Sequence, residues 1–549
     1  MPLVSWPGAP RTPVVFCVMD GVGWGRRDDT DAVFVADTPV LDRLMSEAPH
    51  CLLVAHGRAV GLPSDADMGN SEVGHNAFGA GRVVDQGAKL VDEALRTGGL
   101  YAGRAWQEVV AAARGGALHL IGLVSDGNVH SHVAHLRALI RAAAAAGVGR
   151  IRVHALTDGR DVSARSALSW ILPLEAELDS LPDARIASGG GRMRLTMDRY
   201  EADWEMVARG WRTHVEGEGR RFASAGEAIQ TFYEEDPAVD DQWLPAFVVA
   251  RDGSPVGIIQ DGDAVVLFNF RGDRAIEISR AFEEDEFPCF ERGRRPRVTY
   301  AGMMEYDGDR HIPSRFLVEP PTLEHPVGEH LCEAGRRSFA VSETQKFGHV
   351  TYFFNGNRSG RIDPSLEEYV EIPSDNVQFQ TAPAMQAERI TDAMIAALRS
   401  GQYDHLRLNW ANGDMVGHSG DFAATVQGVE VVDRCLGRLL DAAKDVGAIV
   451  LITADHGNAD EMFELDKSGA PVVVGGHRKP RTSHSLNPVP CVLVDPTGFW
   501  ALDPREADAA AAGGRAGIAS IGPTLLALAG LYPPDTMVPA LVVPARPRA

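Results

Sequence analysis

Two short clusters of acidic residues and histidine lie far apart along the chain: Asp414-Met-Val-Gly-His418 and Asp455-His456. Together with Asp20 and His484 they offer oxygen and nitrogen donors, with no cysteine thiolate among them. Such donors favour Mn²⁺ or a similar divalent ion over a structural zinc site of the cysteine type. Paired divalent ions most often serve phosphoryl chemistry. The residue types therefore predict a two-metal site.

The spacing within each cluster suggests how the donors are shared. Asp414 and His418 are four residues apart, so one helical turn places both on the same face, although a turn of loop fits as well. Asp455 and His456 are neighbours, and on an extended backbone they point to opposite sides. Either cluster alone could be a capping aspartate beside a hydrogen-bonded histidine. Their occurrence together, with Asp20 and His484, favours two metal ions bound side by side.

The candidate nucleophile is Ser71, in the string Asp67-Met-Gly-Asn-Ser71-Glu-Val-Gly-His75-Asn76. A serine hydroxyl needs a base or a metal ion to become a good nucleophile. No Gly-x-Ser-x-Gly elbow surrounds Ser71, which favours metal activation over a hydrolase triad. The alternative is that Ser71 only caps a helix that has Glu72 in its first turn. Both roles are compatible, because a helix N-terminus also attracts phosphate.

The middle of the chain supplies a second set of polar strings, four of which contain arginine. They are Ser125-Asp-Gly-Asn-Val-His130-Ser, Thr157-Asp-Gly-Arg160-Asp161, Gly189-Gly-Gly-Arg192, Met197-Asp-Arg199 and Asn269-Phe-Arg271-Gly-Asp273-Arg274. The planar arginine fork matches carboxylate and phosphate oxygens, so converging arginines could hold a small polyanion. The alternative for each is a surface ion pair. Lys346 could add a positive charge where the domains meet.

Apolar runs that end in polar residues alternate with helical patterns, such as residues 136–146, and predict an α/β fold with parallel sheets and helices on both faces. The predicted strands are residues 14–19, 119–124, 151–156, 264–270, 406–410, 448–453 and 490–494. Ligands of such sheets bind beyond the carboxyl ends of strands. Asp20 and Asp455 both lie there, so the first and last thirds should share one sheet, with the middle inserted as a second domain through residues 79–87 and 307–321.

Composition excludes several other classes of protein. A length of 549 residues exceeds what one hydrophobic core usually supports. A formal charge of −22 argues against nucleic-acid or anionic-membrane partners, which require exposed basic patches. No signal peptide or membrane-spanning run is recognisable, so a cytoplasmic location is expected. The six cysteines form no close pair, which indicates free thiols.

Long strings of the chain resemble cofactor-independent (2,3-bisphosphoglycerate-independent) phosphoglycerate mutases, most closely the long plant-type branch, within the alkaline phosphatase superfamily. The resemblance runs from Asp20 to beyond Pro490, nearly the whole chain. Besides the string around Ser71, it rests on Leu156-Thr-Asp-Gly-Arg-Asp161, Gly189-Gly-Gly-Arg-Met193, Ser342-Glu-Thr-Gln-Lys-Phe-Gly-His-Val-Thr351, Asn412-Gly-Asp-Met-Val-Gly-His418 and Thr453-Ala-Asp-His-Gly-Asn458.

The resemblance implies an architecture and an activity. It implies an alkaline-phosphatase-like parallel-sheet domain from residues 1–85 and 318–549, and an inserted α/β transferase domain from residues 88–315. The implied reaction interconverts 3-phosphoglycerate and 2-phosphoglycerate in glycolysis and gluconeogenesis, through a phosphoserine at Ser71 and without added 2,3-bisphosphoglycerate. Two divalent ions are implied, with Mn²⁺ preferred and Mg²⁺ or Co²⁺ as alternatives. We expect a monomer whose two domains close over the substrate.

The resemblance also implies roles for individual residues. One ion would be held by Asp20, Asp455 and His456 with Ser71, and the other by Asp414, His418 and His484. Asp161 would serve as general acid or base, and Lys346 would contact the reacting phosphate. The substrate-binding set would be His130, Arg160, Asp161, Arg192, Arg199, Arg271, Arg274 and Lys346. The competing hypotheses are another metal-dependent phosphomutase or phosphatase of the superfamily, and a catalytically silent metal-binding scaffold.

Overall fold

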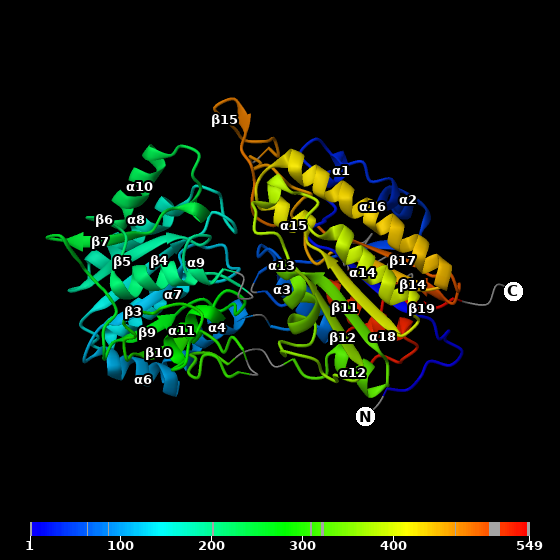
Figure 1. Cartoon of the computed structure of the whole chain (residues 1–549), viewed down its shortest axis with the longest axis horizontal. Helices are drawn as coiled ribbons and strands as arrows, with labels where there is room; N and C mark the ends of the chain where they lie inside the picture. The colour runs from blue at the N-terminus through cyan, green and yellow to red at the C-terminus, as the bar shows by residue number, and fades with distance from the viewer. Residues whose placement is uncertain are drawn as a thin grey trace. The chain divides into compact units, whose positions relative to one another are not determined.

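The computed structural model describes residues 3–62, 64–85, 87–199, 203–307, 310–319, 323–466, 468–503, 505 and 516–545. The chain forms two compact units, which we call unit 1 (Met1–Gln86 and Thr322–Ala549) and unit 2 (Gly87–Pro321). Each unit is built around one large sheet with helices, so the predicted α/β class is confirmed (Figure 1). Gln86 and residues 320–322, where the chain passes from one unit to the other, lie outside the described residues.

The sheet of unit 1 has seven strands in the order β12-β11-β13-β1-β14-β17-β2. The strands from β12 to β14 pair in parallel, and β17 is antiparallel to both of its neighbours. Strand β1, near the N-terminus, lies between two strands from the last third of the chain. The bounds are β1 (Val14–Met19), β2 (His50–Leu53), β11 (Ser338–Glu343), β12 (Glu367–Ile372), β13 (His405–Trp410), β14 (Ile449–Thr453) and β17 (Val489–Val494).

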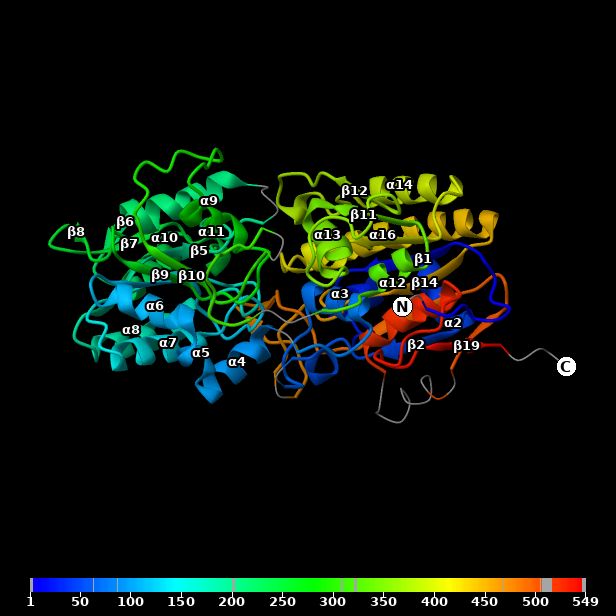
Figure 2. The ribbon, with the colours of Figure 1, turned by 90° about the horizontal axis from the view of Figure 1, so that it is seen from below.

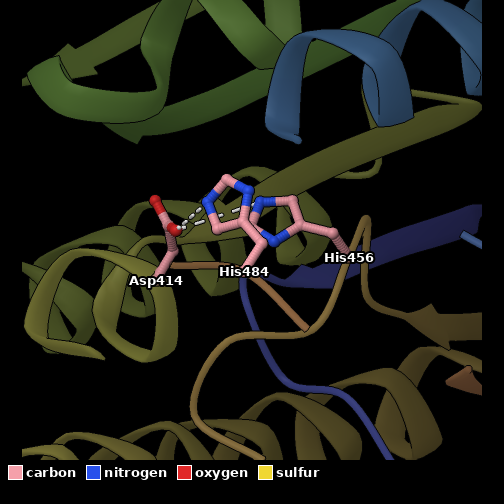
Figure 3. Close-up of side chains that lie close together, drawn as sticks. All are labelled: Asp414, His456 and His484. Atoms are coloured by element: carbon pink, nitrogen blue, oxygen red, sulfur yellow. Dashed lines mark hydrogen bonds and ion pairs between the residues drawn. The ribbon is translucent and has the colours of Figure 1, made fainter. Parts of the chain in front are cut away.

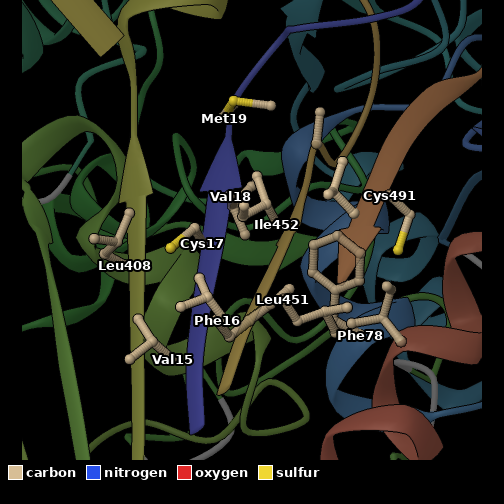
Figure 4. Packing of buried hydrophobic residues seen from close by; sticks show 14 of the residues in the cluster. Val15, Phe16, Cys17, Val18, Met19, Phe78, Leu408, Leu451, Ile452 and Cys491 are labelled. Carbon is tan, nitrogen blue, oxygen red and sulfur yellow. The ribbon is translucent and has the colours of Figure 1, made fainter. Parts of the chain in front are cut away.

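Strand β1 reads as a continuous apolar run because both of its faces are covered. Helices α14 (Ala387–Arg399) and α16 (Phe422–Val446) pack together on one face, and α3 (Ser71–Ala80), α12 (Val327–Glu333) and α18 (Ile521–Leu528) pack together on the other (Figure 2). Figure 4 shows this strand between Leu408 of β13 and Ile452 of β14. The ring of Phe16 meets that of Phe78 of α3 edge-on, with centroids 5.2 Å apart.

The sheet of unit 2 has eight strands, in the order β10-β9-β3-β4-β5-β7-β6 with β8 paired to β7. The run from β10 to β5 is parallel, and β7 is antiparallel to β5. The strands are β3 (Leu118–Leu123), β4 (Ile151–Thr157), β5 (Ala184–Gly191), β6 (Arg220–Phe222), β7 (Phe247–Arg251), β8 (Ser254–Pro255), β9 (Ala264–Leu267) and β10 (Thr299–Gly302).

Shorter elements complete both units. Unit 1 adds α1 (Ala32–Val35), α2 (Pro39–Glu47), η1 (Gly57–Val60), α13 (Thr344–Gly348), η4 (His349–Phe353), η5 (Phe379–Thr381), α15 (Asn412–Gly417), β15 (Val473–Val474), β16 (His477–Arg478), β18 (Trp500–Leu502), η6 (Ile518–Ser520) and β19 (Val542–Pro544). Unit 2 adds α4 (Gly87–Thr97), α5 (Gly99–Ala102), α6 (Arg104–Ala113), α7 (Val133–Ala145), α8 (Ala167–Asp179), α9 (Trp204–Trp211), η2 (Arg212–Glu216), α10 (Ala225–Glu235), η3 (Asp241–Trp243) and α11 (Ile276–Glu283). Across the described residues, no helix combines the length and apolar character that a membrane crossing requires.

Two predicted elements differ from the structure by more than one residue at an end. The strand predicted at 264–270 ends at Leu267, because the chain turns away so that the Phe270 N–H can donate to the His130 carbonyl, at 2.8 Å. The helix predicted at 136–146 begins earlier, at Val133, since the His132 side chain caps it by accepting from the Ala134 N–H. Histidine is not among the usual capping residues, which is why the pattern missed this start.

Candidate metal centre and arginine pocket

Eight polar side chains gather at the carboxyl ends of the parallel strands of unit 1. They are Asp20, Ser71, Lys346, Asp414, His418, Asp455, His456 and His484, and none exposes more than 5% of its surface. Asp20 directly follows β1, and α13 and α15, which carry Lys346 and Asp414, directly follow β11 and β13. The structure thus brings together all seven residues predicted to bind metal. Lys346, predicted to lie where the domains meet, is placed within this centre.

Ser71 is the first residue of α3 and does not cap it. The cap is Asn70, whose side chain accepts from the Val73 N–H, so the alternative interpretation of Ser71 as the capping residue is wrong. The Ser71 Oγ instead lies 2.5 Å from Lys346 Nζ, 3.0 Å from His456 Nε2 and 3.3 Å from Asp20 Oδ1. The hydroxyl therefore faces charged groups at the amino end of a helix.

The donors form two groups that could each hold an ion: Asp20, Asp455 and His456, and Asp414, His456 and His484. Within each group the ligand atoms all lie within 4.8 Å of one another. Figure 3 shows the imidazoles of His456 and His484 turned toward the Asp414 carboxylate. The family resemblance implies a single ion for His456, whereas its ring belongs to both groups. His418 Nε2 lies 2.9 Å from Asp414 Oδ1 and 3.0 Å from His484 Nε2, beside the second group.

Backbone carbonyls orient two of the histidines. His418 Nδ1 lies 2.6 Å from the Thr482 carbonyl oxygen, and His484 Nδ1 lies 2.7 Å from that of Gly69. A carbonyl only accepts, so each Nδ1 carries the proton and each Nε2 keeps a lone pair for an ion. This arrangement is typical of metal-binding histidines, whose other nitrogen is held by a hydrogen bond.

Two asparagines support the carboxylates and were not singled out from the sequence. Asn409 Nδ2 donates to Asp20 Oδ2 at 2.7 Å, and Asn458 Nδ2 donates to Asp414 Oδ1 at 3.2 Å. Asn458 ends the string Thr453-Ala-Asp-His-Gly-Asn458, so its place in that string was the available signal. Asn409 lies inside the apolar strand β13, where only strand register reveals its neighbour.

The charges of the centre fit divalent cations. Lys346 Nζ lies 2.7 Å from both Asp20 Oδ1 and Asp414 Oδ2, and buried carboxylates require such partners. Burial lowers the pKa of His456, but Asp455 and other carboxylates outweigh it and raise that pKa to about 9. A divalent cation that binds to these carboxylates and imidazoles displaces the protons that they carry. Oxygen and nitrogen donors without sulfur suit Mn²⁺, Mg²⁺ or Co²⁺, so the residues present fit a pair of such ions.

Unit 2 holds a cluster of buried arginines at the carboxyl ends of its own parallel strands, which we call the arginine pocket. Its predicted members are His130, Arg160, Asp161, Arg192, Arg199, Arg271 and Arg274, and each exposes 7% or less. The alternative that these arginines form ordinary surface ion pairs is therefore wrong. The strings that carry them follow β3, β4, β5 and β9, which are adjacent in the sheet and converge at one edge.

Three aspartates hold the arginines in place. Arg192 pairs with Asp158 Oδ1 at 2.8 Å and also with Asp161, while Arg271 Nε lies 2.9 Å from Asp273 Oδ1. Asp198 is also buried and interacts with Arg274, so five buried arginines face four buried aspartates and the arginines remain in excess. Burial and these arginines hold the pKa of His130 well below its usual value, so its ring stays neutral. A small polyanion would complete the charge balance of the pocket.

Comparison with known proteins identifies the family. A model of the Metalloenzyme superfamily matches residues 12–533. The 2,3-bisphosphoglycerate-independent phosphoglycerate mutase of Trypanosoma brucei brucei is 53% identical over 545 residues, which span 97% of this chain and 98% of that protein. The chain belongs to the 2,3-bisphosphoglycerate-independent phosphoglycerate mutase family. The resemblance found in the sequence is thereby confirmed.

Other members of the family agree in sequence and fold. The mutase of Zea mays is 49% identical over 508 residues, covering 90% of this chain and 91% of that protein. A crystal structure of Leishmania mexicana phosphoglycerate mutase at low cobalt concentration superposes with a TM-score of 0.96. The two sequences are 50% identical, and the superposition covers 99% of this chain and 100% of the Leishmania mexicana chain. The family fold therefore extends over both units.

A buried carboxyl group beside the metal centre should make stability depend on pH. Glu343 directly precedes α13, the helix that carries Lys346, and accepts from Ser374 Oγ at 2.8 Å. Burial raises its pKa to about 7 from the ordinary 4.5. A raised pKa favours the folded state at low pH, and this contribution is lost as pH rises from about 4.5 through 7. Relative to Glu343→Gln, the wild type should lose roughly 3 kcal/mol of unfolding free energy between pH 5 and 8.

Urea unfolding of both proteins at the two pH values measures this difference. The matched control is Glu371→Gln, which changes an exposed carboxyl group on the adjacent strand β12. An identical pH dependence in the wild type and Glu343→Gln would show that Glu343 titrates normally.

Proposed function

We propose that this protein is a 2,3-bisphosphoglycerate-independent phosphoglycerate mutase that interconverts 3-phosphoglycerate and 2-phosphoglycerate through a phosphoserine at Ser71. The observation that carries the proposal is the placement of the Ser71 hydroxyl, 2.5 Å from Lys346 Nζ and 3.0 Å from His456 Nε2. This serine stands where a metal-assisted nucleophile is needed, in a chain 53% identical to a mutase. We assign the reaction to glycolysis and gluconeogenesis, in a cytoplasmic monomer.

The two domains would divide the work. Residues 1–85 and 318–549 would form the phosphatase-like domain that carries the phosphoryl group, and residues 88–315 the transferase domain that binds glycerate. The arginine pocket supports the second assignment, because Arg192, Arg271 and their neighbours offer several planar forks to carboxylate and phosphate oxygens. His130 remains neutral among them and can donate a hydrogen bond to the substrate.

Asp20, Asp455 and His456 with Ser71, and Asp414, His418 and His484, are the residues that would hold the two divalent ions. When bound, such ions lower the pKa of a serine hydroxyl and neutralise phosphoryl oxygens, and Mn²⁺ is the ion we favour. Lys346 supplies a further cation, which its contacts with Asp20 and Asp414 hold in place beside Ser71 Oγ. The amino end of α3 adds the favourable field of a helix N-terminus for the phosphate.

The reaction balances without another reactant. Ser71 Oγ gives up its proton and bonds to phosphorus while the bond from phosphorus to the C3 oxygen breaks. The C3 oxygen takes up a proton, which leaves phosphoserine and glycerate. The C2 hydroxyl then attacks the phosphoserine, loses its proton and regenerates the serine. Asp161 would take and return the protons of the glycerate hydroxyls, because its pairing with Arg192 keeps the carboxylate in place.

Replacement of the nucleophile should abolish turnover. Ser71→Ala should lower kcat by at least about a thousandfold, since the alanine side chain has no oxygen to carry the phosphoryl group. The assay is the conversion of 3-phosphoglycerate to 2-phosphoglycerate without 2,3-bisphosphoglycerate. Ser520→Ala is the matched control, because Ser520 also exposes 4% and lies at the start of α18. A mutase rate that survived in Ser71→Ala would refute the phosphoserine, and phosphate release by the wild type would favour the phosphatase alternative.

Removal of metal should stop the reaction reversibly. We expect chelator-treated protein to lose activity and regain it with Mn²⁺, and calorimetric titration to show two ions per chain. The midpoint of thermal unfolding should also rise with Mn²⁺, because ligand binding stabilises the folded state. Asp414→Asn should weaken both effects. Full activity in protein shown by elemental analysis to be free of metal would contradict the two-metal assignment.

The proton-transfer role of Asp161 can be tested separately. Asp161→Asn should lower kcat about 10² to 10⁴-fold, the usual contribution of general acid–base catalysis. Asp126→Asn, which changes an exposed carboxyl group in the string after β3, should leave the rate unchanged. An Asp161→Asn variant that keeps the full mutase rate would assign the role to another group.

A further inference from the structure

Six polar side chains in unit 2 are hydrogen-bonded end to end through its core, and the proposed reaction uses none of them. They run from Asp263 to His119, His154, Ser188, His214 and Thr196, and each exposes 5% or less. The successive distances are 3.1, 2.9, 2.7, 2.8 and 3.0 Å. We call this set the histidine chain. Isolated polar groups are costly in a core, whereas a fully connected network of this kind rigidifies it.

The chemistry of the groups fixes the direction of every hydrogen bond. Asp263 accepts at both carboxylate oxygens, from the Ala117 and Gln260 N–H groups at 2.8 and 2.7 Å, so His119 Nε2 must donate to it. Burial holds the pKa values of the three imidazoles below the ordinary value, at about 3 for His214, so each ring is neutral with one donor and one acceptor.

The directions then follow in turn along the chain. His154 donates from Nε2, Ser188 donates to His154 Nδ1, and His214 donates from Nδ1 to Ser188 Oγ. The hydroxyl of Thr196 is therefore the last donor, to His214 Nε2.

The histidine chain runs along the sheet from the amino ends of its parallel strands toward their carboxyl ends. Asp263 directly precedes β9 and so lies at the amino ends of the parallel strands. Thr196 follows β5 and lies beyond the carboxyl ends, where the arginines converge. Between them, His119 lies on β3 and His154 and Ser188 face each other in register on β4 and β5. The imidazoles of His119 and His154 stack with centroids 5.2 Å apart.

Thr196, the last residue of the histidine chain, has a strained backbone conformation. Its φ is 68°, a left-handed conformation that is rare and unfavourable for a β-branched residue. Three contacts hold it there: its N–H donates to the Met206 carbonyl at 3.0 Å, its hydroxyl donates to His214, and Gly210 lies against its side chain. A Cβ at Gly210 would lie 2.1 Å from Thr196 Oγ1, so the close approach requires glycine.

The loop that Thr196 fixes carries two of the five arginines of the arginine pocket. Arg192 and Arg199 lie on either side of it, and the carbonyl of its neighbour Met197 accepts from Arg274 at 2.6 Å. The side chain of Met197 packs with Leu195, Leu123 and Leu156. A change in the Thr196 backbone would therefore move the Met197 carbonyl and the arginine that it holds.

We infer that Thr196, held by the histidine chain, is a positioning residue that fixes the 192–199 loop so that Arg199 and Arg274 are ready to bind an anionic substrate. The inference rests on the proposed function, because it takes the arginine pocket as the glycerate site. The strained φ favours positioning over simple satisfaction of core polar groups, since the fold tolerates strain where it sets a binding geometry.

The test compares Thr196→Val, which removes the hydroxyl, with Thr196→Ser, which keeps it. Thr196→Val should raise the KM for 3-phosphoglycerate about tenfold with kcat within about twofold, since a positioning residue acts on binding. Thr196→Ser should keep the KM near that of the wild type. Thr213→Val is the matched control, because Thr213 is buried in η2 beside His214 and its hydroxyl donates to the Arg209 carbonyl instead. An unchanged KM in Thr196→Val would overturn the inference.

A measurement on the wild type keeps the inference testable even if Thr196→Val does not fold. Nitrogen-15 NMR of histidine-labelled protein should show neutral His214 with its proton on Nδ1 and neutral His119 with its proton on Nε2. A proton on Nε2 of His214 would exclude donation from Thr196 and overturn the inference. This measurement needs no substrate, so it tests the hydrogen-bond directions of the histidine chain independently of activity. A wild type with no mutase turnover would refute the proposed function and leave this result unaffected.

Discussion

Buried unlike charges held close together are the interaction on which both sites depend. In unit 1 the Lys346 ammonium lies 2.7 Å from each of two carboxylates, and without it those groups would be buried beside one another without a cation. In unit 2 the arginines exceed their aspartate partners. Parallel strands allow both arrangements, because polar residues that follow successive strands meet beyond the carboxyl ends of those strands. The apolar strands themselves form the core.

The two sites differ in what would complete their charge. The metal centre has an excess of carboxylates and imidazoles, which suits divalent cations, whereas the arginine pocket has an excess of cations, which suits an anion. The histidine chain adds a third use of buried polarity. Its three imidazoles and two hydroxyls are neutral, and they connect the Asp263 carboxylate, at the amino ends of the strands, to a strained threonine beyond their carboxyl ends.

The sequence predicted the α/β fold and the metal-binding residue types, because these signals are local: apolar runs followed by Asp, His or Ser. It could not decide between the two roles of Ser71, since Asn70 is an equally good cap and only the backbone shows which residue fills that position. The sharing of His456 between two groups, and the support from Asn409, depend on strand register. The histidine chain gave no signal, because its members come from separate strands and helices. Domain closure stays a prediction.

The order of strands in unit 1 has a consequence for synthesis on the ribosome. Strand β1 pairs with β13 and β14, so the centre of this sheet has no partners until the last third of the chain has emerged. Unit 2 is continuous from Gly87 to Pro321 and can fold while that third is still being made. Asp20 and Ser71 are the first of the eight centre residues to leave the ribosome. They have no complete metal centre to join until His484, the last of the eight, has been made. A truncated chain would carry a complete arginine pocket without a metal centre.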